Sequence, residues 1–311
     1  MISLIIPTLN AERHISGLLE SIHEQTVQAD EVLIVDSSSK DNTQSIAKSR
    51  GAKVVPINRN DFDHGGTRQM AVEMTQNAEV VVFLTQDALL ADKNALKNLL
   101  IPFDDEKIGA AYGRQLPRPD ANPIAAHARL FNYPPVSQIK TLKDATKFGI
   151  KTTFISNSFA AYRYIALMDV SGFPSNTILN EDTYVAAKML LAGWKIAYCA
   201  DAMVYHSHNY GFIEEFKRYF DIGVFHAREP WIRQAFGQAE GDGMRYVRSE
   251  FRYLWNENPM LIPSAILRNM LKFISYKLGT IEQYLPIWLK RQLSMQKLFW
   301  DTISFTAKIS K

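Results

Sequence analysis

Two adjacent carboxylates, Glu181 and Asp182, begin an apolar run that ends at Gly193. The spacing of this run predicts a helix over 181–192, with both acids in its first turn at the positive end of the helix dipole. Carboxylates in that position stay ionised easily, and one of them can accept a proton from an incoming hydroxyl group. The same pair also makes an ordinary helix start, so its chemical meaning depends on the acids that precede it.

The N-terminal part of the chain alternates short apolar runs with segments of helical periodicity. Predicted strands cover 3–7, 31–36, 53–57 and 80–84, and predicted helices cover 10–24, 43–50 and 67–78. Right-handed crossovers would join these strands into a doubly wound, mostly parallel sheet flanked by helices. The order therefore predicts an α/β fold.

Polar residues stand where three of the predicted strands end. These residues are Thr8, Asn10, Asp36, Ser38 and Asp87. Ligands of open α/β sheets bind beyond the carboxyl ends of the strands, so these side chains are candidates for a ligand site. The alternative is that Asp and Asn stand there only because they favour turns.

Taken in order along the chain, four motifs resemble those of glycosyltransferase family 2. They are Pro7–Thr8–Leu9–Asn10, the strand that ends at Asp36, Thr85–Gln86–Asp87, and Glu181–Asp182. The resemblance covers roughly residues 1–210. It implies a GT-A fold and an inverting transferase that takes its sugar from a nucleotide-sugar donor.

The resemblance also implies a role for each acid. Asp182 would be the catalytic base, and Asp87 would bind a divalent metal, Mg²⁺ or Mn²⁺, on the donor diphosphate. Thr85 replaces the first acid of the Asp-x-Asp motif that the family usually has there. Asp36 would accept a hydrogen bond from the nucleobase. The other expected donor-binding residues are Pro7, Thr8, Asn10, Glu12, Ser38, Arg68 and Gln86.

Two histidines follow the last predicted core strand. In several members of the family a histidine at this place is a further metal ligand, and the resemblance implies this role for His206. Residues two apart on a strand face the same side, so His208 is a second candidate. The alternative for both is a purely structural histidine.

The string from Asp61 to Ala71 resembles a sub-group of the family, the rhamnosyltransferases, which use dTDP-L-rhamnose. Gly65 and Gly66 would open a helix whose N-terminal amide groups suit anions. Arg68 in that helix would neutralise diphosphate charge. The alternative is a loop-to-helix junction with solvated acids.

Three residues are expected on the acceptor side or as orienting groups. Asn157 lies in a segment that resembles the one beneath the sugar and acceptor in the family, although Ser-Asn-Ser is also an ordinary turn. Glu181 would orient the helix start or touch the acceptor. Trp194 could stack on an apolar sugar face, and a core position is the alternative.

Composition limits the class of protein. The chain has 311 residues, of which 47% are hydrophobic and 22% charged, as in ordinary globular proteins. The single cysteine, Cys199, excludes an internal disulfide and suits a reducing compartment. No signal peptide and no apolar run of membrane-spanning length is apparent. We therefore expect a cytoplasmic location.

The C-terminal region differs in charge from the rest. The net charge of the chain is +3, and from Pro263 onward eight basic residues face two acids. We expect a catalytic domain over 1–212 and a helical region over 213–311. Basic residues beside Trp and Phe suit the inner face of a membrane. The alternative is a helical subdomain that packs on the catalytic domain or on a second subunit, as in a homo-oligomer.

Together these features predict transfer of a sugar, with L-rhamnose from dTDP-L-rhamnose expected, to a saccharide acceptor in bacterial surface polysaccharide synthesis. The acceptor would be carried on a lipid. A UDP-sugar donor, a sugar-nucleotide nucleotidyltransferase and a non-catalytic sugar-binding scaffold are the alternatives. No recognition motif supports a nucleic-acid partner.

Overall fold

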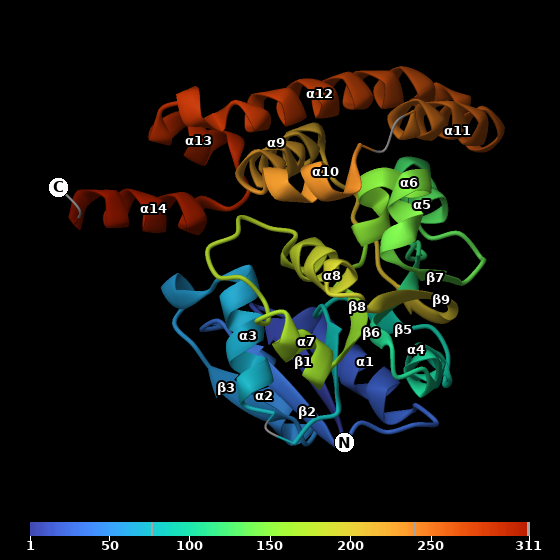
Figure 1. The fold of residues 1–311 in the computed structure, drawn as a ribbon, viewed down its shortest axis with the longest axis vertical. Helices are drawn as coiled ribbons and strands as arrows, with labels where there is room; N and C mark the ends of the chain where they lie inside the picture. The colour runs from blue at the N-terminus through green and yellow to red at the C-terminus, as the bar shows by residue number, and fades with distance from the viewer. Residues whose placement is uncertain (76, 239–240, 310–311) are drawn as a thin grey trace.

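The computed structural model describes residues 1–75, 77–238 and 241–309, with side chains described as far as Ile303. Its core is one mixed sheet with helices on both faces, and a group of C-terminal helices lies across one end of this unit (Figure 1). The predicted α/β class with a C-terminal helical extension is confirmed.

The sheet is built from nine strands. They are β1 (Ile2–Thr8), β2 (Glu31–Asp36), β3 (Lys53–Pro56), β4 (Val80–Leu84), β5 (Leu89–Leu90), β6 (Ile108–Leu116), β7 (Gln138–Lys140), β8 (Phe159–Arg163) and β9 (Lys195–Tyr205). The order across the sheet is β3-β2-β1-β4-β8-β6-β9-β5, and β7 also pairs with β9. Strands β3, β2, β1 and β4 are mutually parallel, and β8 runs antiparallel to both β4 and β6.

Helices within the sheet unit connect these strands. They are α1 (Glu12–His23), α2 (Thr43–Ser49), α3 (His64–Glu73), α4 (Ala95–Leu100), α5 (Pro123–Asn132), α6 (Ala145–Phe148), α7 (Tyr164–Asp169) and α8 (Glu181–Leu191). The C-terminal helices are α9 (Phe212–Arg228), α10 (Pro230–Phe236), α11 (Asp242–Glu257), α12 (Ile262–Thr280), α13 (Ile287–Leu293) and α14 (Lys297–Ile309).

Alternation along the strands places apolar side chains on both faces of the sheet. On β1, Leu4 and Ile6 pack with α1 and α4, whereas Ile5 packs with α3 and α8. Each of these three side chains is fully buried. Two hydrophobic cores, one on each face, therefore hold the strand ends in place.

Some elements differ from the sequence-based expectation. The pattern of apolar residues predicts two short strands over 196–198 and 203–205, but β9 is continuous, and its register against β6 shifts between Cys199 and Met203. Helix α3 begins at His64 rather than at Thr67 because Asp63 caps it, accepting a hydrogen bond from the Gly66 amide.

Helices α9 and α12 cross at two glycines. A Cβ on Gly223 would lie 2.2 Å from the Tyr276 carbonyl oxygen, and a Cβ on Gly279 would lie 2.1 Å from that of Phe220. The two backbones therefore touch without intervening side chains, and α12 is fixed closely against α9. Phe220 and Val224 of α9 join the same hydrophobic core as α8. The division at residue 212 stays a prediction.

No helix among the described residues is both long and apolar enough to cross a membrane.

Candidate active site

Residues that follow β4 line two cavities. A cavity of about 530 Å³, here the histidine cavity, is lined by Asp87, Asp182, His206 and His208, and it extends to side chains of α9, α11 and α12. A cavity of about 780 Å³, here the strand-end cavity, is lined by Pro7, Thr8, Ser37, Gln86 and the loop 59–64. Thr85 and Asp87 face the first cavity, and Gln86 between them faces the second.

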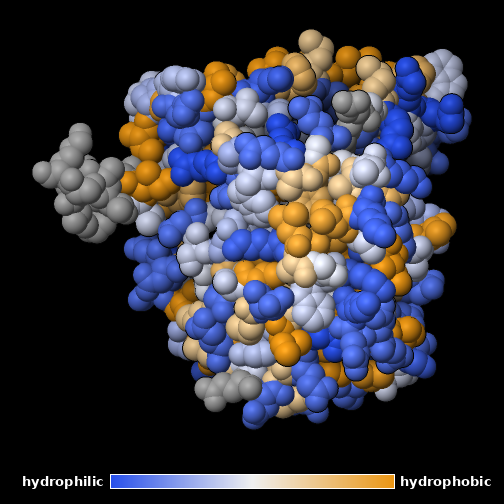
Figure 2. Space-filling view, viewed as in Figure 1, coloured by the Kyte–Doolittle hydropathy of each residue, from blue (hydrophilic) through white to orange (hydrophobic). Residues whose placement is uncertain are grey.

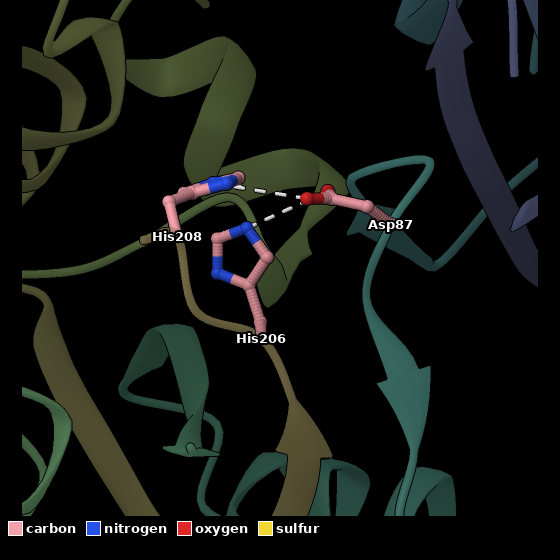
Figure 3. Close-up of side chains that lie close together, drawn as sticks. All are labelled: Asp87, His206 and His208. Carbon is pink, nitrogen blue, oxygen red and sulfur yellow. Dashed lines mark ion pairs between the residues drawn. The ribbon is translucent and has the colours of Figure 1, made fainter. Parts of the chain in front are cut away.

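Asp87, His206 and His208 form a compact cluster (Figure 3). His206 Nε2 lies 3.5 Å from Asp87 Oδ1, and His208 Nε2 lies 3.7 Å from Asp87 Oδ2. One ligand atom from each residue lies within 4.8 Å of the others. Burial acts to raise the pKa of Asp87, but the hydrogen bond and charge of His206 outweigh it and hold that pKa well below its usual range. The cluster thus presents an ionised carboxylate and two imidazoles to one point.

Gln115 on β6 fixes which nitrogen of His206 carries the proton. Gln115 Oε1 accepts a hydrogen bond from Arg129 Nη1 at 2.6 Å and lies 2.9 Å from His206 Nδ1. Arginine can only donate, so the amide oxygen faces the histidine and Nδ1 must be its donor. In neutral His206 the lone pair of Nε2 then points at a carboxylate oxygen. Two facing acceptors require a proton or a cation between them, and a divalent cation fits this donor set.

Glu181 and Asp182 begin α8, as predicted, and they differ in environment. The backbone amide of Asn157 donates to Asp182 Oδ2 at 3.1 Å, and the side-chain amide of Asn157 donates to Glu181 Oε1 at 3.0 Å. Asp182 lines the histidine cavity, whereas Glu181 lines neither cavity. Burial, together with the charge of Glu181, raises the pKa of Asp182. Asp182 can therefore take up a proton more readily than an ordinary aspartate.

Arg68 lies against Glu181. Its Nη1 atom is 3.1 Å from Glu181 Oε1, and both side chains are 7% exposed. Burial acts to raise the pKa of Glu181, but Arg68, His64 and Asn157 outweigh it and lower that pKa. Arg68 lines neither cavity, so its expected contact with a diphosphate stays a prediction. Gly65 permits the close approach of α3 to Pro174, because a Cβ at Gly65 would lie 1.8 Å from the Pro174 carbonyl oxygen.

Asp36 is the centre of a hydrogen-bond network behind the strand-end cavity. Its carboxylate accepts hydrogen bonds from the Thr8 hydroxyl at 2.9 Å, the Ser39 amide at 2.9 Å and Gln44 Nε2 at 2.7 Å. Asp36 is fully buried, whereas Thr8 and Ser37 reach the cavity. This network positions the strand ends, and a direct contact between Asp36 and a nucleobase stays a prediction.

Three other expected donor-binding residues hold the neighbouring loop. Asn10 accepts a hydrogen bond from the Lys40 amide, and Glu12 accepts two from Asn42. Ser38 donates to the Ile57 carbonyl. None of the three lines the strand-end cavity, so their contact with a donor also stays a prediction. Pro7, Thr8 and Gln86 do line it, and Gln86 is held by two hydrogen bonds to the Leu9 backbone.

Trp194 is not brought to the site. It follows the C-terminal end of α8, at the opposite end of that helix from Asp182, and its indole nitrogen donates to Asp169 at 2.9 Å. It also packs against Gly109. Sequence reasoning missed Gln115, which follows Arg114 near the end of β6 and carries no local signal of its role. It also missed Asn180, whose φ of 59° turns the chain into α8.

The mixed sheet, the acids at its strand ends and the carboxylate-histidine cluster define a GT-A glycosyltransferase. The model of glycosyl transferase family 2 matches residues 3–171. The chain belongs to this family and is a glycosyltransferase, which excludes the nucleotidyltransferase and scaffold alternatives.

Relatives are similar along the whole length. The O-antigen chain rhamnosyltransferase RfbN of Salmonella typhimurium is 50% identical over 307 residues, which cover 98% of each chain. The O-antigen chain rhamnosyltransferase WbaN of Salmonella anatum is 47% identical over 306 residues, which cover 98% of this chain and 97% of that protein. The similarity thus includes the C-terminal helices.

Solved structures share the fold. A mannosyltransferase of Pyrobaculum calidifontis, solved with GDP-Man and Mn²⁺, gives a TM-score of 0.54 at 19% identity and covers 100% of this chain and 87% of that one. TarS of Staphylococcus aureus, solved with UDP-GlcNAc, gives 0.52 at 18% identity and covers 91% of each chain.

Proposed function

We propose that this glycosyltransferase moves L-rhamnose from dTDP-L-rhamnose to a hydroxyl group of a saccharide acceptor during O-antigen synthesis, with inversion at the anomeric carbon. The observation that carries the proposal is the identity of 50% and 47% with two O-antigen rhamnosyltransferases over 98% of the chain. The position of Asp182 beside the carboxylate-histidine cluster in one cavity supports it.

Asp182 is the base in this proposal. Its carboxylate takes the proton of the acceptor hydroxyl while the hydroxyl oxygen attacks the anomeric carbon and the bond to the diphosphate breaks on the opposite face. The raised pKa of Asp182 favours proton uptake. The backbone amide of Asn157 donates a hydrogen bond to Asp182 Oδ2 and so holds the Asp182 side chain in the cavity.

Asp87, His206 and His208 would hold a divalent cation, Mg²⁺ or Mn²⁺, and the two imidazoles favour Mn²⁺. Such a cation offsets the negative charge that grows on the leaving diphosphate. Structures of the same fold contain Mn²⁺. The nucleoside would occupy the strand-end cavity, and the acceptor would occupy the histidine cavity.

A lipid-linked acceptor agrees with the surface of the C-terminal helices. Met244, Val247, Phe251 and Trp255 form an exposed apolar stripe along α11, beside exposed Arg248 and Arg252. Exposed apolar residues continue along α12, and Figure 2 shows hydrophobic patches over this upper edge of the molecule. Aromatic and basic side chains together suit an anionic membrane surface. We place the protein on the cytoplasmic face of the membrane through this stripe.

Vesicle flotation tests the membrane contact. The wild type should float with vesicles of phosphatidylethanolamine and phosphatidylglycerol, and a Phe251→Ser/Trp255→Ser variant should not. Ile165→Ser, at another exposed apolar residue on α7, is the matched control and should float. Flotation of the double variant equal to that of the wild type would show that the α11 stripe does not make the membrane contact.

A turnover assay tests the transfer itself. The purified protein is incubated with a lipid-linked saccharide and with dTDP-L-rhamnose, a UDP-sugar or a GDP-sugar, with and without EDTA. Acceptor-dependent release of dTDP that EDTA abolishes is expected. Release of UDP or GDP instead would contradict dTDP-L-rhamnose as the donor. Release of dTDP that persists with EDTA would contradict the requirement for a divalent cation.

A further inference from the structure

The C-terminal segment Ser294–Ile303 forms one wall of the strand-end cavity. Residues 295–299, 302 and 303 line this cavity together with Thr8 and Gln86, although they are far from both in the sequence. The C-terminal helices therefore do more than extend the fold: they return the end of the chain to the strand ends that begin it.

The segment is fixed to the body of the protein on both sides of this wall. At its start, Asp221 of α9 accepts the Met295 amide at 2.9 Å, and Ser294 is fully buried. At its far side, Trp300 is fully buried beneath the Arg228 guanidinium and the Lys290 ammonium group, with 5.2 Å from each to the ring. Both cations pair with Glu282. The residues between these two anchors are held at the cavity.

The opposite wall contacts the same segment. The loop 59–64 lines the cavity, and His64 at the start of α3 hydrogen-bonds to the Gln296 side chain. This bond joins the C-terminal segment to the helix that carries Arg68. The cavity is thus enclosed between the strand ends, this loop and the segment.

Two cationic side chains on these walls are available to an anion. Arg59 and Lys297 line the cavity, are exposed, and form no ion pair within the part of the chain that the structure describes. The acids on the same walls are engaged: Asp63 accepts the amides of Gly66 and Asn176, and Asp61 accepts Asn58 Nδ2 at 2.9 Å. A free ammonium group beside a nucleotide-sized cavity can approach a diphosphate as a point charge.

We infer that Lys297 is a donor-binding residue, contributed by the C-terminal segment, whose ammonium group contacts the diphosphate of a nucleoside diphosphate in the strand-end cavity. This inference rests on the proposed function, because it takes the donor to bind there. Lys297 lines the strand-end cavity, whereas the cation site at Asp87 lines the histidine cavity. The two would therefore contact the diphosphate from opposite sides of the end of β4. It places one determinant of donor affinity outside the residues 3–171 that the family model matches.

Titration calorimetry of the full chain tests the inference with dTDP and with thymidine as probes. Lys297→Met should weaken dTDP binding about tenfold, as expected for the loss of one charge-assisted contact of about 1.4 kcal/mol. It should leave thymidine binding unchanged, and Lys297→Arg should retain dTDP binding. Lys143→Met, at an exposed lysine that lines neither cavity, is the matched control and should bind like the wild type.

The outcomes separate this inference from the proposed function. Wild-type turnover with dTDP release, together with equal dTDP affinity of the wild type and Lys297→Met, overturns the inference alone. If the wild type binds UDP or GDP in place of dTDP, the same comparison is made with that nucleotide, and a selective loss in Lys297→Met still supports the inference. Failure of the wild type to bind any of the three overturns both.

Discussion

Arg68 and Glu181 form a buried ion pair, with 3.1 Å between Arg68 Nη1 and Glu181 Oε1. The arginine keeps Glu181 ionised, and the ionised Glu181 in turn raises the pKa of its neighbour Asp182. Two adjacent carboxylates thus acquire different chemistry from their surroundings, as is common where one acid must exchange a proton. This difference supports the proposal that Glu181 is a positioning residue and that Asp182 transfers the proton.

Asp182→Asn should lower kcat by about 10²–10⁴-fold, because the amide cannot accept the acceptor proton. Donor affinity should change little, since Asp182 lines the other cavity. Steady-state rates and dTDP calorimetry measure the two effects. Asp169→Asn, which alters the partner of Trp194, is the control and should retain activity. Near wild-type turnover in the Asp182 variant would show that another group is the base.

Turnover should increase with pH across the neutral range. Asp182 acts as a base only when it is ionised, and burial together with Glu181 raises its pKa. The rate of Arg68→Lys should follow the same profile, because lysine preserves the charge at Glu181. A pH profile of kcat/KM reports the free enzyme, and a flat profile across the neutral range would contradict the assignment.

Arg68→Met should reduce the free energy of unfolding by about 3–5 kcal/mol, because it leaves Glu181 buried without its partner. The double variant Arg68→Met/Glu181→Gln should recover most of this loss, since the uncompensated charge is then removed. Urea unfolding of the three proteins measures the effect. A loss below about 1 kcal/mol in the single variant would mean that water reaches Glu181.

Gln115→Ala should weaken Mn²⁺ binding by about 10–100-fold, because His206 loses the hydrogen bond that fixes its Nδ1 proton. Calorimetry with Mn²⁺ alone measures this change without a turnover assay. Gln234→Ala, on the exposed side of α10, should bind Mn²⁺ like the wild type. Unchanged affinity in Gln115→Ala would contradict the orienting role.

Asp221 should make stability depend on pH. Burial raises its pKa to about 7, against an ordinary value of 3.8. The folded protein therefore holds a proton in this window that the unfolded chain has lost, and stability falls as pH rises from about 4 to 7. Asp221→Asn should remove this component and be at least as stable as the wild type at pH 8. Urea unfolding at several pH values checks it, and a parallel pH dependence in both proteins would contradict it.

Local sequence patterns were sufficient for the strands β1 and β2, which end at Thr8 and Asp36, and for β4, which ends shortly before Asp87, because each is a short apolar run followed by polar residues. They were also sufficient for α8, whose two acids begin the helix as expected. The family resemblance pointed to His206, the two-residue spacing pointed to His208, and the structure brings both to Asp87.

Long-range contacts were beyond the reach of local pattern. Arg68 pairs with Glu181 across more than a hundred residues, and nothing near Arg68 in the sequence distinguishes that partner from a bound diphosphate. The return of Lys297 to the strand ends depends on how α9, α12 and α13 pack. The two interpretations of Trp194 could not be separated locally, because an indole that packs on a helix end has the same sequence signature as one that stacks on a sugar.

The close crossing of α9 and α12 at Gly223 and Gly279 has a mechanical consequence. With backbone against backbone there is no soft layer of side chains to slide or tilt, so α12 and the helices packed on it behave as a rigid arm. In the proposed membrane orientation this arm would set a fixed height between the bilayer surface and Asp182. The part of the acceptor that the enzyme can reach would then depend on Gly223 and Gly279, which are far from any reacting atom.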